Sequence, residues 1–157
     1  MGARRSVIIQ VESPKRPDVG RLLREHLEEM GIHSPPESIH ALDIEGLCSP
    51  AITFWTARED EELLGCGALL ELDERHGEIK SMRTVGRYLR RGVASAILHR
   101  ILLEAAQRSY VRLSLETGSM AAFAPARALY ARFGFVFCEP FANYVPDPNS
   151  VFMTRTL

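Results

Sequence analysis

Residues 78–94 read Glu-Ile-Lys-Ser-Met-Arg-Thr-Val-Gly-Arg-Tyr-Leu-Arg-Arg-Gly-Val-Ala. The run Glu78–Met82 is strand-like, and a long amphipathic helix follows Gly92. The glycine and the small residues after it let backbone N–H groups approach a ligand closely, and the helix start adds unpaired donors and the positive end of a dipole. Arg90 and Arg91 add full positive charge. The segment therefore predicts a pyrophosphate-binding loop, and solvated surface arginines are the alternative interpretation.

The elements around this loop follow from periodicity and breaker residues. Before it, Ala51–Ala57, Leu63–Leu72 and Glu78–Thr84 predict three strands in an antiparallel meander. After it come a helix from Gly92 to about Arg108, a strand at Val111–Glu116, a helix at Ala121–Phe133, and strands at Phe135–Cys138 and Val151–Thr156. At the N-terminal side we expect a strand at Ser6–Val11, a helix from Pro17 that ends at Gly31, a break at Ser34–Ser38, and a short helix through Ile39, Leu42 and Asp43.

This order predicts an α+β fold, with a twisted, mixed, mostly antiparallel sheet of six to seven strands and about four helices. The chain has 157 residues, 46% of them hydrophobic and 25% charged. We therefore expect one domain over 1–157, with a core that needs no disulfide or metal.

Charge and cysteine usage exclude several classes of function. The formal net charge is −1 and no long basic run is present, which disfavours nucleic acid as a partner. Three cysteines without C-x-x-C spacing and five histidines without a ligand motif argue against disulfides and a metal site. No apolar run is long enough for a membrane span, so we expect a soluble, cytoplasmic protein without a membrane partner.

Two segments resemble the GNAT superfamily of N-acetyltransferases. Leu89-Arg90-Arg91-Gly92-Val93-Ala94 after the strand is similar to the family's Q/R-x-x-G-x-G/A acetyl-CoA loop. Ala128-Leu129-Tyr130-Ala131-Arg132-Phe133-Gly134-Phe135 is similar to its A-x-x-L-Y-x-x-x-G-F signature. Leu115–Gly118 and Tyr144–Met153 look like an uncharacterised bacterial branch. The resemblance implies an acetyl-CoA-dependent N-acetyltransferase that acts by direct attack of an amine in a ternary complex, without a metal.

Two positions depart from the family pattern. Leu89 stands where the loop usually begins with Gln or Arg, so one side-chain contact to phosphate is missing. Phe123 stands where many members carry an Asn that touches the pantetheine arm. The coenzyme-binding residues that the resemblance implies are Met82, Arg83, Thr84, Arg90, Arg91, Gly92, Val93, Ala94, Ser95, Phe123, Ala126 and Tyr130.

The resemblance also suggests catalytic roles. Tyr130 is the expected general acid at the coenzyme sulfur, against the alternative of an ordinary core aromatic. Glu78 and Glu116 are rival candidates for the base, and the alternative for Glu78 is a surface residue facing Lys80. The backbone N–H of Met82 is the expected donor to the thioester oxygen.

The acceptor is expected to be a small-molecule amine or a protein amino group. The segments that could shape its site are the Ser34–Ser38 loop, Trp55 and the excursion from Asn143-Tyr144 to Asn149-Ser150, with an acidic lining from Asp43, Glu45, Asp147 or Glu116. The resemblance further suggests a possible homodimer formed through the C-terminal strands. The alternative function is a catalytically weak acyl-CoA-binding or regulatory module of the same fold.

Overall fold

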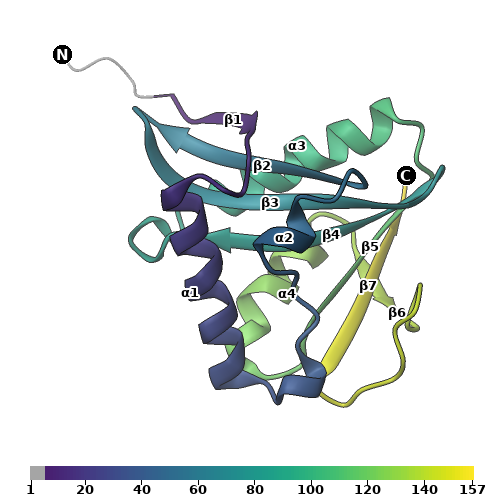
Figure 1. The fold of residues 1–157 in the computed structure, drawn as a ribbon. Coiled ribbons are helices and arrows are strands. Elements are labelled where there is room, and N and C mark those ends of the chain that lie inside the picture. Colours follow the sequence, from purple (N-terminus) through teal and green to yellow (C-terminus); the bar gives the residue numbers. More distant parts are fainter. Residues whose placement is uncertain (1–5) are drawn as a thin grey trace.

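The structure, a computed structural model, describes residues 6–157. Within this range seven strands form one sheet in the order β1-β2-β3-β4-β5-β7-β6 (Figure 1). Only β4 and β5 are parallel neighbours, and all other pairs are antiparallel. The predicted meander and the mixed, mostly antiparallel sheet are therefore confirmed. The strands are β1 (Ile8–Val11), β2 (Ile52–Glu59), β3 (Glu62–Asp73), β4 (His76–Thr84), β5 (Arg112–Gly118), β6 (Val136–Cys138) and β7 (Ser150–Thr156).

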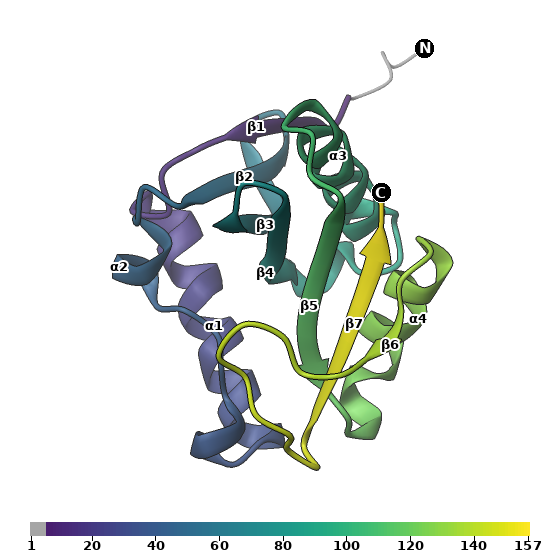
Figure 2. The same ribbon diagram turned by 90° about the vertical axis from the view of Figure 1, so that its right-hand side faces the viewer.

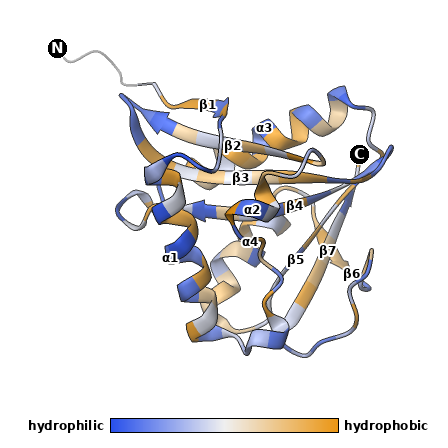
Figure 3. Cartoon of the chain, in the orientation of Figure 1, coloured by the Kyte–Doolittle hydropathy of each residue, from blue (hydrophilic) through white to orange (hydrophobic). Residues whose placement is uncertain are grey.

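Helices cover both faces of this sheet (Figures 1 and 2). The described residues contain α1 (Pro17–His33), α2 (Ile44–Leu47), α3 (Val93–Gln107) and α4 (Ala124–Arg132), with 3₁₀ turns at η1 (Pro36–Ser38), η2 (Gly86–Tyr88) and η3 (Ala121–Phe123). α1 and α2 pack on one face and α3 and α4 on the other, because α1 and α3 each carry one hydrophobic side (Figure 3). None of these helices is long and apolar enough to cross a membrane.

Two hydrophobic clusters fill the two faces. The α1 side holds Val19, Leu22, Leu23, Leu47, Phe54, Leu63, Cys66 and Ala68. The α3 side is larger and includes Trp55, Leu69, Ile97, Leu98, Ile101, Leu113, Leu115, Tyr130 and Met153. The apolar face predicted for the helix after Gly92 is thus the centre of the larger cluster.

Several predicted boundaries were wrong. α1 continues through Gly31 to His33 and ends where Pro35 and Pro36 forbid further helix. The short helix expected through Ile39, Leu42 and Asp43 does not form, because Asp43 instead caps α2, accepting a 2.8 Å hydrogen bond from Gly46 N. The helix predicted over Ala121–Phe133 is η3 followed by α4, with Pro125 in the first turn of α4. The first strand begins at Ile8 rather than Ser6.

β4 and β5 separate along their length, and this separation creates the site. Their parallel pairing runs only from His76↔Arg112 to Ile79↔Leu115. Beyond it, β4 continues to Thr84 beside β3, while β5 continues to Gly118 beside β7. The register of β4 against β3 also shifts between Lys80 and Arg83, and Ser81 in this bulge has φ of 54°. A wedge-shaped opening therefore lies between the C-terminal halves of the two strands.

Candidate functional site

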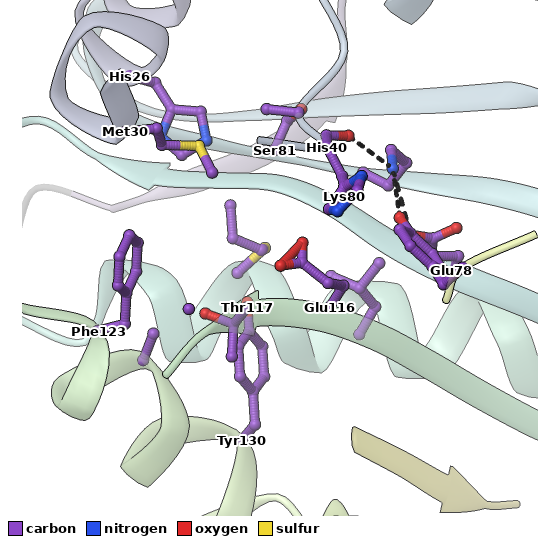
Figure 4. Close-up of a pocket in the computed structure, with 16 residues that line it drawn as sticks. His26, Met30, His40, Glu78, Lys80, Ser81, Glu116, Thr117, Phe123 and Tyr130 are labelled. Atoms are coloured by element: carbon purple, nitrogen blue, oxygen red, sulfur yellow. Dashed lines mark hydrogen bonds and ion pairs between the residues drawn. The ribbon is translucent and has the colours of Figure 1, made fainter. Parts of the chain in front are cut away.

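A pocket of about 120 Å³ occupies the opening between β4 and β5 (Figure 4). Its walls come from both strands, from α1, and from η3 and α4. The segment between η1 and α2 and the segment between β6 and β7 complete the lining. The lining residues are His26, Met30, His40, Ala41, Glu78, Ile79, Lys80, Ser81, Met82, Glu116, Thr117, Gly118, Phe123, Ala126, Tyr130 and Tyr144. All three residues with predicted catalytic roles, Glu78, Glu116 and Tyr130, are among them.

Glu116 lies on β5 one residue past the end of its pairing with β4. Its side chain points into the pocket (Figure 4). Burial raises the pKa of the Glu116 carboxyl to about 7. The negative charges of Glu78 and Asp147 add to this shift, and the positive charge of Lys80 opposes it. A carboxyl with this pKa can exchange a proton near neutral pH.

Tyr130 reaches the same pocket from α4 (Figure 4). The residue is only 6% exposed, and its ring packs edge-on against Phe135. Burial, with the charge of Glu116, raises the pKa of the Tyr130 hydroxyl well above its ordinary value. The described residues supply no hydrogen-bond partner for this hydroxyl, so it remains available to a ligand. Tyr130 is thus both a core aromatic and a member of the pocket.

Glu78 is held in a buried polar network. Its Oε2 accepts a 2.5 Å hydrogen bond from the Tyr144 hydroxyl. The same oxygen forms an ion pair with Lys80 Nζ at a distance of 3.2 Å. Lys80 Nζ also donates to the Tyr144 hydroxyl, at 3.2 Å, and to the carbonyl oxygen of His40, at 3.3 Å. The side chains of Glu78 and Lys80 are 4% and 9% exposed. The interpretation of Glu78 as a surface residue was therefore wrong, although its expected neighbour Lys80 is indeed its partner.

The segment 139–149, which we call the strap, connects β6 to β7 and crosses to the loop between α1 and α2 (Figure 2). Ser38 donates a 2.6 Å hydrogen bond to Asp147 Oδ2, and the Tyr144 ring packs edge-on against His40 at 5.0 Å. Inside the strap, Phe141 packs against both Tyr144 and Phe152. The strap and the loop thus meet beside the Glu78 end of the pocket.

The predicted coenzyme loop adopts the conformation that its sequence requires. Gly92 precedes α3 with φ of 80°, in the left-handed region, and Arg90 has φ of 64°. Arg90, Arg91 and Gly92 are exposed, as is Leu89 at 58%. The amides of Val93, Ala94 and Ser95 form the first turn of α3, where the helix itself supplies no acceptor for them. This arrangement fits a phosphate group.

Some of the other predicted coenzyme residues line the pocket, and Arg83 and Thr84 do not. Met82, Phe123 and Ala126 line the pocket directly. The Phe123 ring packs closely against Gly118, since a Cβ at Gly118 would lie 2.2 Å from a ring atom of Phe123. The side chain of Arg83 forms an ion pair with Glu29 of α1 through one terminal nitrogen, while its buried Nε has no hydrogen-bond partner among the described residues. Thr84 is the last residue of β4.

Parts of the predicted acceptor site were wrong. Trp55 is 1% exposed in the α3-side core and cannot contact an acceptor. Asp43 caps α2, and Glu45 lies 3.9 Å from Lys15 on the surface, so neither lines this pocket. Asp147 fastens the strap instead of lining the pocket. Glu116 and Glu78 supply the acidic lining.

Sequence reasoning did not assign Lys80, His26 or His40 to the site, and it included Tyr144 only as part of the excursion before the last strand, without a role. Tyr144 is 66 residues from Glu78 in sequence, and no local pattern joins them. His26 is on the inner side of α1, where burial lowers its pKa to about 4 and the charge of Arg83 contributes in the same direction. The only available signal was the length of the excursion that contains Tyr144.

Comparison with known proteins identifies the family. The model of the Acetyltransferase (GNAT) family matches residues 19–135. The chain is 60% identical to the uncharacterised N-acetyltransferase YsnE of Bacillus subtilis, over 95% of this chain and 99% of the relative. It is 36% identical to the IAA acetyltransferase of Azospirillum brasilense, over 97% and 99%. A putative acyl-CoA N-acyltransferase of Klebsiella pneumoniae has the same fold, with a TM-score of 0.78 at 27% identity over 96% and 97% of the two chains. An acetyltransferase of Elizabethkingia anophelis with acetyl-CoA bound superimposes with a TM-score of 0.68, at 17% identity over 96% and 98%. The chain therefore belongs to the GNAT family of acetyltransferases.

Proposed function

We propose that the protein transfers the acetyl group of acetyl-CoA directly to a primary amine within a ternary complex. The observation that carries this proposal is the pocket between the separated strands, where Glu116 and Tyr130 converge. A carboxyl that titrates near neutral pH and an unpartnered phenol are the two proton-handling groups that amine acylation requires. No other pair of predicted catalytic residues shares these properties.

The residues present fit the coenzyme. The exposed arginines and the first-turn amides of α3 suit a pyrophosphate, and the opening along Met82, Phe123 and Ala126 suits a narrow chain. When bound, acetyl-CoA supplies an acetyl group already activated as a thioester. The loss of a Gln or Arg at Leu89 removes one side-chain contact, while the backbone donors of the loop remain.

Glu116 is our candidate for the base. An alkylammonium with a pKa near 10 must lose a proton before it can attack, and Glu116 is charged and able to accept that proton above about pH 7. Glu78 is less suited, because its Oε2 already accepts from Lys80 and Tyr144. We assign Glu78 the role of orienting the amine.

Tyr130 is our candidate for the donor at the departing sulfur. Its raised pKa keeps the hydroxyl protonated throughout the neutral range. The hydroxyl can therefore donate a hydrogen bond to developing negative charge on the thiolate. The backbone of Met82, in the bulge of β4, is the corresponding candidate donor to the acetyl oxygen.

The fold alone does not choose the acceptor. Structures with the same fold include one named as an aminoglycoside 6′-N-acetyltransferase and one named as a ribosomal-protein-S18-alanine N-acetyltransferase, both under 25% identical to this chain. The argument for the acceptor class must come from the pocket of this chain.

Two measurements test the proposal. Calorimetric titration should show micromolar binding of acetyl-CoA, with ATP and NAD as negative controls. A screen of amines for release of free thiol should then show turnover that Tyr130→Phe slows by about 10- to 100-fold, with coenzyme binding retained. Tyr110→Phe is the matched control, since Tyr110 is also buried but bonds Glu71 outside the pocket. Binding without any transfer would favour the alternative of an acyl-CoA-binding module, and absence of acetyl-CoA binding would contradict both.

A further inference from the structure

The one lysine that lines the pocket has no free hydrogen-bond donor. An ammonium group has three N–H donors. Lys80 directs them at Glu78 Oε2, the Tyr144 hydroxyl and the carbonyl oxygen of His40, at 3.2, 3.2 and 3.3 Å. With a side chain 9% exposed, Lys80 is enclosed by these partners. It balances the charge of Glu78 and leaves no cation for a ligand.

The other charged groups of the lining are negative. Glu78 and Glu116 both face the pocket from the two strands. His26, at the opposite side, is uncharged at neutral pH because its pKa is about 4. No arginine among residues 6–157 lines the pocket, and the His40 ring, which does line it, packs edge-on against Tyr144. A ligand group that enters between the two strands therefore meets carboxylates, and Lys80, the cation bonded to Glu78, has no N–H donor left for it.

The strap limits the size of what can enter at this end. Ser38 bonds Asp147, Asn149 donates to Ser38 at 3.4 Å, and Tyr144 reaches across to β4. These contacts fasten the strap to the α1–α2 loop over the Glu78 end of the pocket. The strap therefore encloses the Glu78 end of the pocket, and this enclosure favours a small acceptor over a folded protein segment.

We propose that the acceptor is a small primary amine with no carboxylate beside its amino group, and that Tyr144 sets this selectivity by occupying Lys80. This inference rests on the proposed acetyl transfer and specifies its substrate class. In an α-amino acid the carboxylate is bonded to the carbon that carries the amine. An amine placed at Glu116 would therefore bring that carboxylate against the negative charge of Glu116 and beside Glu78, whose partner Lys80 has no N–H left to donate. The charge of Glu116 repels the carboxylate, and burial leaves it unpaired.

Matched pairs of acceptors test the selectivity in the unmodified protein. Phenethylamine against phenylalanine, and tyramine against tyrosine, differ only in the carboxylate. We expect kcat/KM for each amine to exceed that for its amino acid by about 100-fold or more, from the several kcal/mol that a like-charge contact costs. A short peptide with a free N-terminal alanine probes the size limit and should be a poor acceptor. Amino acids or the peptide used as well as the amines would overturn the inference.

Tyr144→Phe tests the role of the tyrosine. The variant keeps the ring against His40 and Phe141 but frees one N–H of Lys80, so an acceptor carboxylate gains a partner. We expect the ratio of amine to amino acid to fall by about 10-fold, in line with one hydrogen bond to a charged group. Tyr110→Phe should leave the ratio unchanged. A ratio in Tyr144→Phe equal to that of the unmodified protein would overturn the assignment of Tyr144.

Binding measurements separate this inference from the function on which it rests. Phenethylamine and phenylalanine are titrated calorimetrically onto the complex of the protein with CoA, which needs no turnover. Tighter binding of the amine supports the inference. Equal or tighter binding of the amino acid, or no binding of either by a protein that does bind acetyl-CoA, overturns the inference alone. Failure to bind acetyl-CoA or to acetylate any amine counts against the proposed function itself.

Discussion

The Tyr144 hydroxyl donates a 2.5 Å hydrogen bond to Glu78 Oε2, and this bond joins the strap to the centre of β4. Together with Lys80 it fixes Glu78 in one orientation and balances its charge. No cation among the described residues is bonded to Glu116, on the facing strand, and burial raises its pKa to about 7. Two carboxylates in one pocket are thereby given different properties by their neighbours.

Replacement of Glu116 by Gln should remove the base. We expect kcat to fall by about 100-fold or more, with little change in the Kd for acetyl-CoA. In the unmodified protein kcat should rise with pH through about 7, as Glu116 loses its proton, and level off above it. Glu116→Gln should lose this rise. The pH profile of kcat under saturating amine is the measurement.

Glu78→Gln provides the comparison. Glu78 orients the amine in this mechanism, so we expect Glu78→Gln to raise the KM for the amine. The pH at which kcat rises should stay near 7. A loss of the pH dependence in Glu78→Gln, with its retention in Glu116→Gln, would reverse the two assignments.

The same pKa shift predicts a cost in stability. A carboxyl whose folded pKa is raised, from 4.5 to about 7, destabilises the fold progressively as pH rises through that interval. At pH 8.5 the cost is about 3.4 kcal/mol at most, from 1.36 kcal/mol per unit. We therefore expect Glu116→Gln to unfold at higher denaturant concentration than the unmodified protein at pH 8.5, and at nearly the same concentration at pH 4.5. Equal stabilities at pH 8.5 would show that Glu116 is not desolvated.

Gly92 should be required for coenzyme binding. Its φ of 80° lies in the left-handed region, which costs a residue with a Cβ about 1–2 kcal/mol. A shift of this turn would misplace the first-turn amides of α3, so we expect Gly92→Ala to weaken acetyl-CoA binding by at least about 10-fold in calorimetry. Gly86→Ala is the matched control, because Gly86 has open space around it and no positive φ. Similar affinities for both variants would exclude the loop as the phosphate site.

The fold could be predicted largely from local signals. The alternation of the three meander strands, the amphipathic helix after Gly92 and the tyrosine-bearing helix each depend on a few neighbouring residues, and all lie where they were expected. The errors occurred at the ends of helices. Asp43, for example, was predicted to lie within a short helix but caps the next one. The half of the site carried by motifs, including Glu116 and Tyr130, was predictable for the same reason.

The acceptor half of the pocket was not predictable in this way. Tyr144 and Lys80 meet because the strap returns over β4, a consequence of tertiary packing across 64 residues. Trp55 was predicted to shape the acceptor site, but its side chain faces the α3-side core from β2. A side chain on a strand has equal chances of facing either layer when both layers are hydrophobic, and the sequence of β2 does not distinguish them.

His26 should make the protein sensitive to mild acid. Its folded pKa, about 4, is below the ordinary 6.5, so its contribution to stability is present above pH 6.5 and is lost as pH falls toward 4. The loss between pH 7 and 4.5 is about 2–3 kcal/mol, from 1.36 kcal/mol per unit. His26→Phe keeps an aromatic ring on the inner side of α1 and removes the titration, so its free energy of unfolding should fall less over this interval than that of the unmodified protein. His33→Phe, at an exposed position, should behave as the unmodified protein does. Chemical denaturation at pH 7, 5.5 and 4.5 gives the free energy of unfolding of the unmodified protein and of both variants. If this free energy fell equally with pH in His26→Phe and in the unmodified protein, His26 would be protonated as readily in the folded state as in the unfolded state.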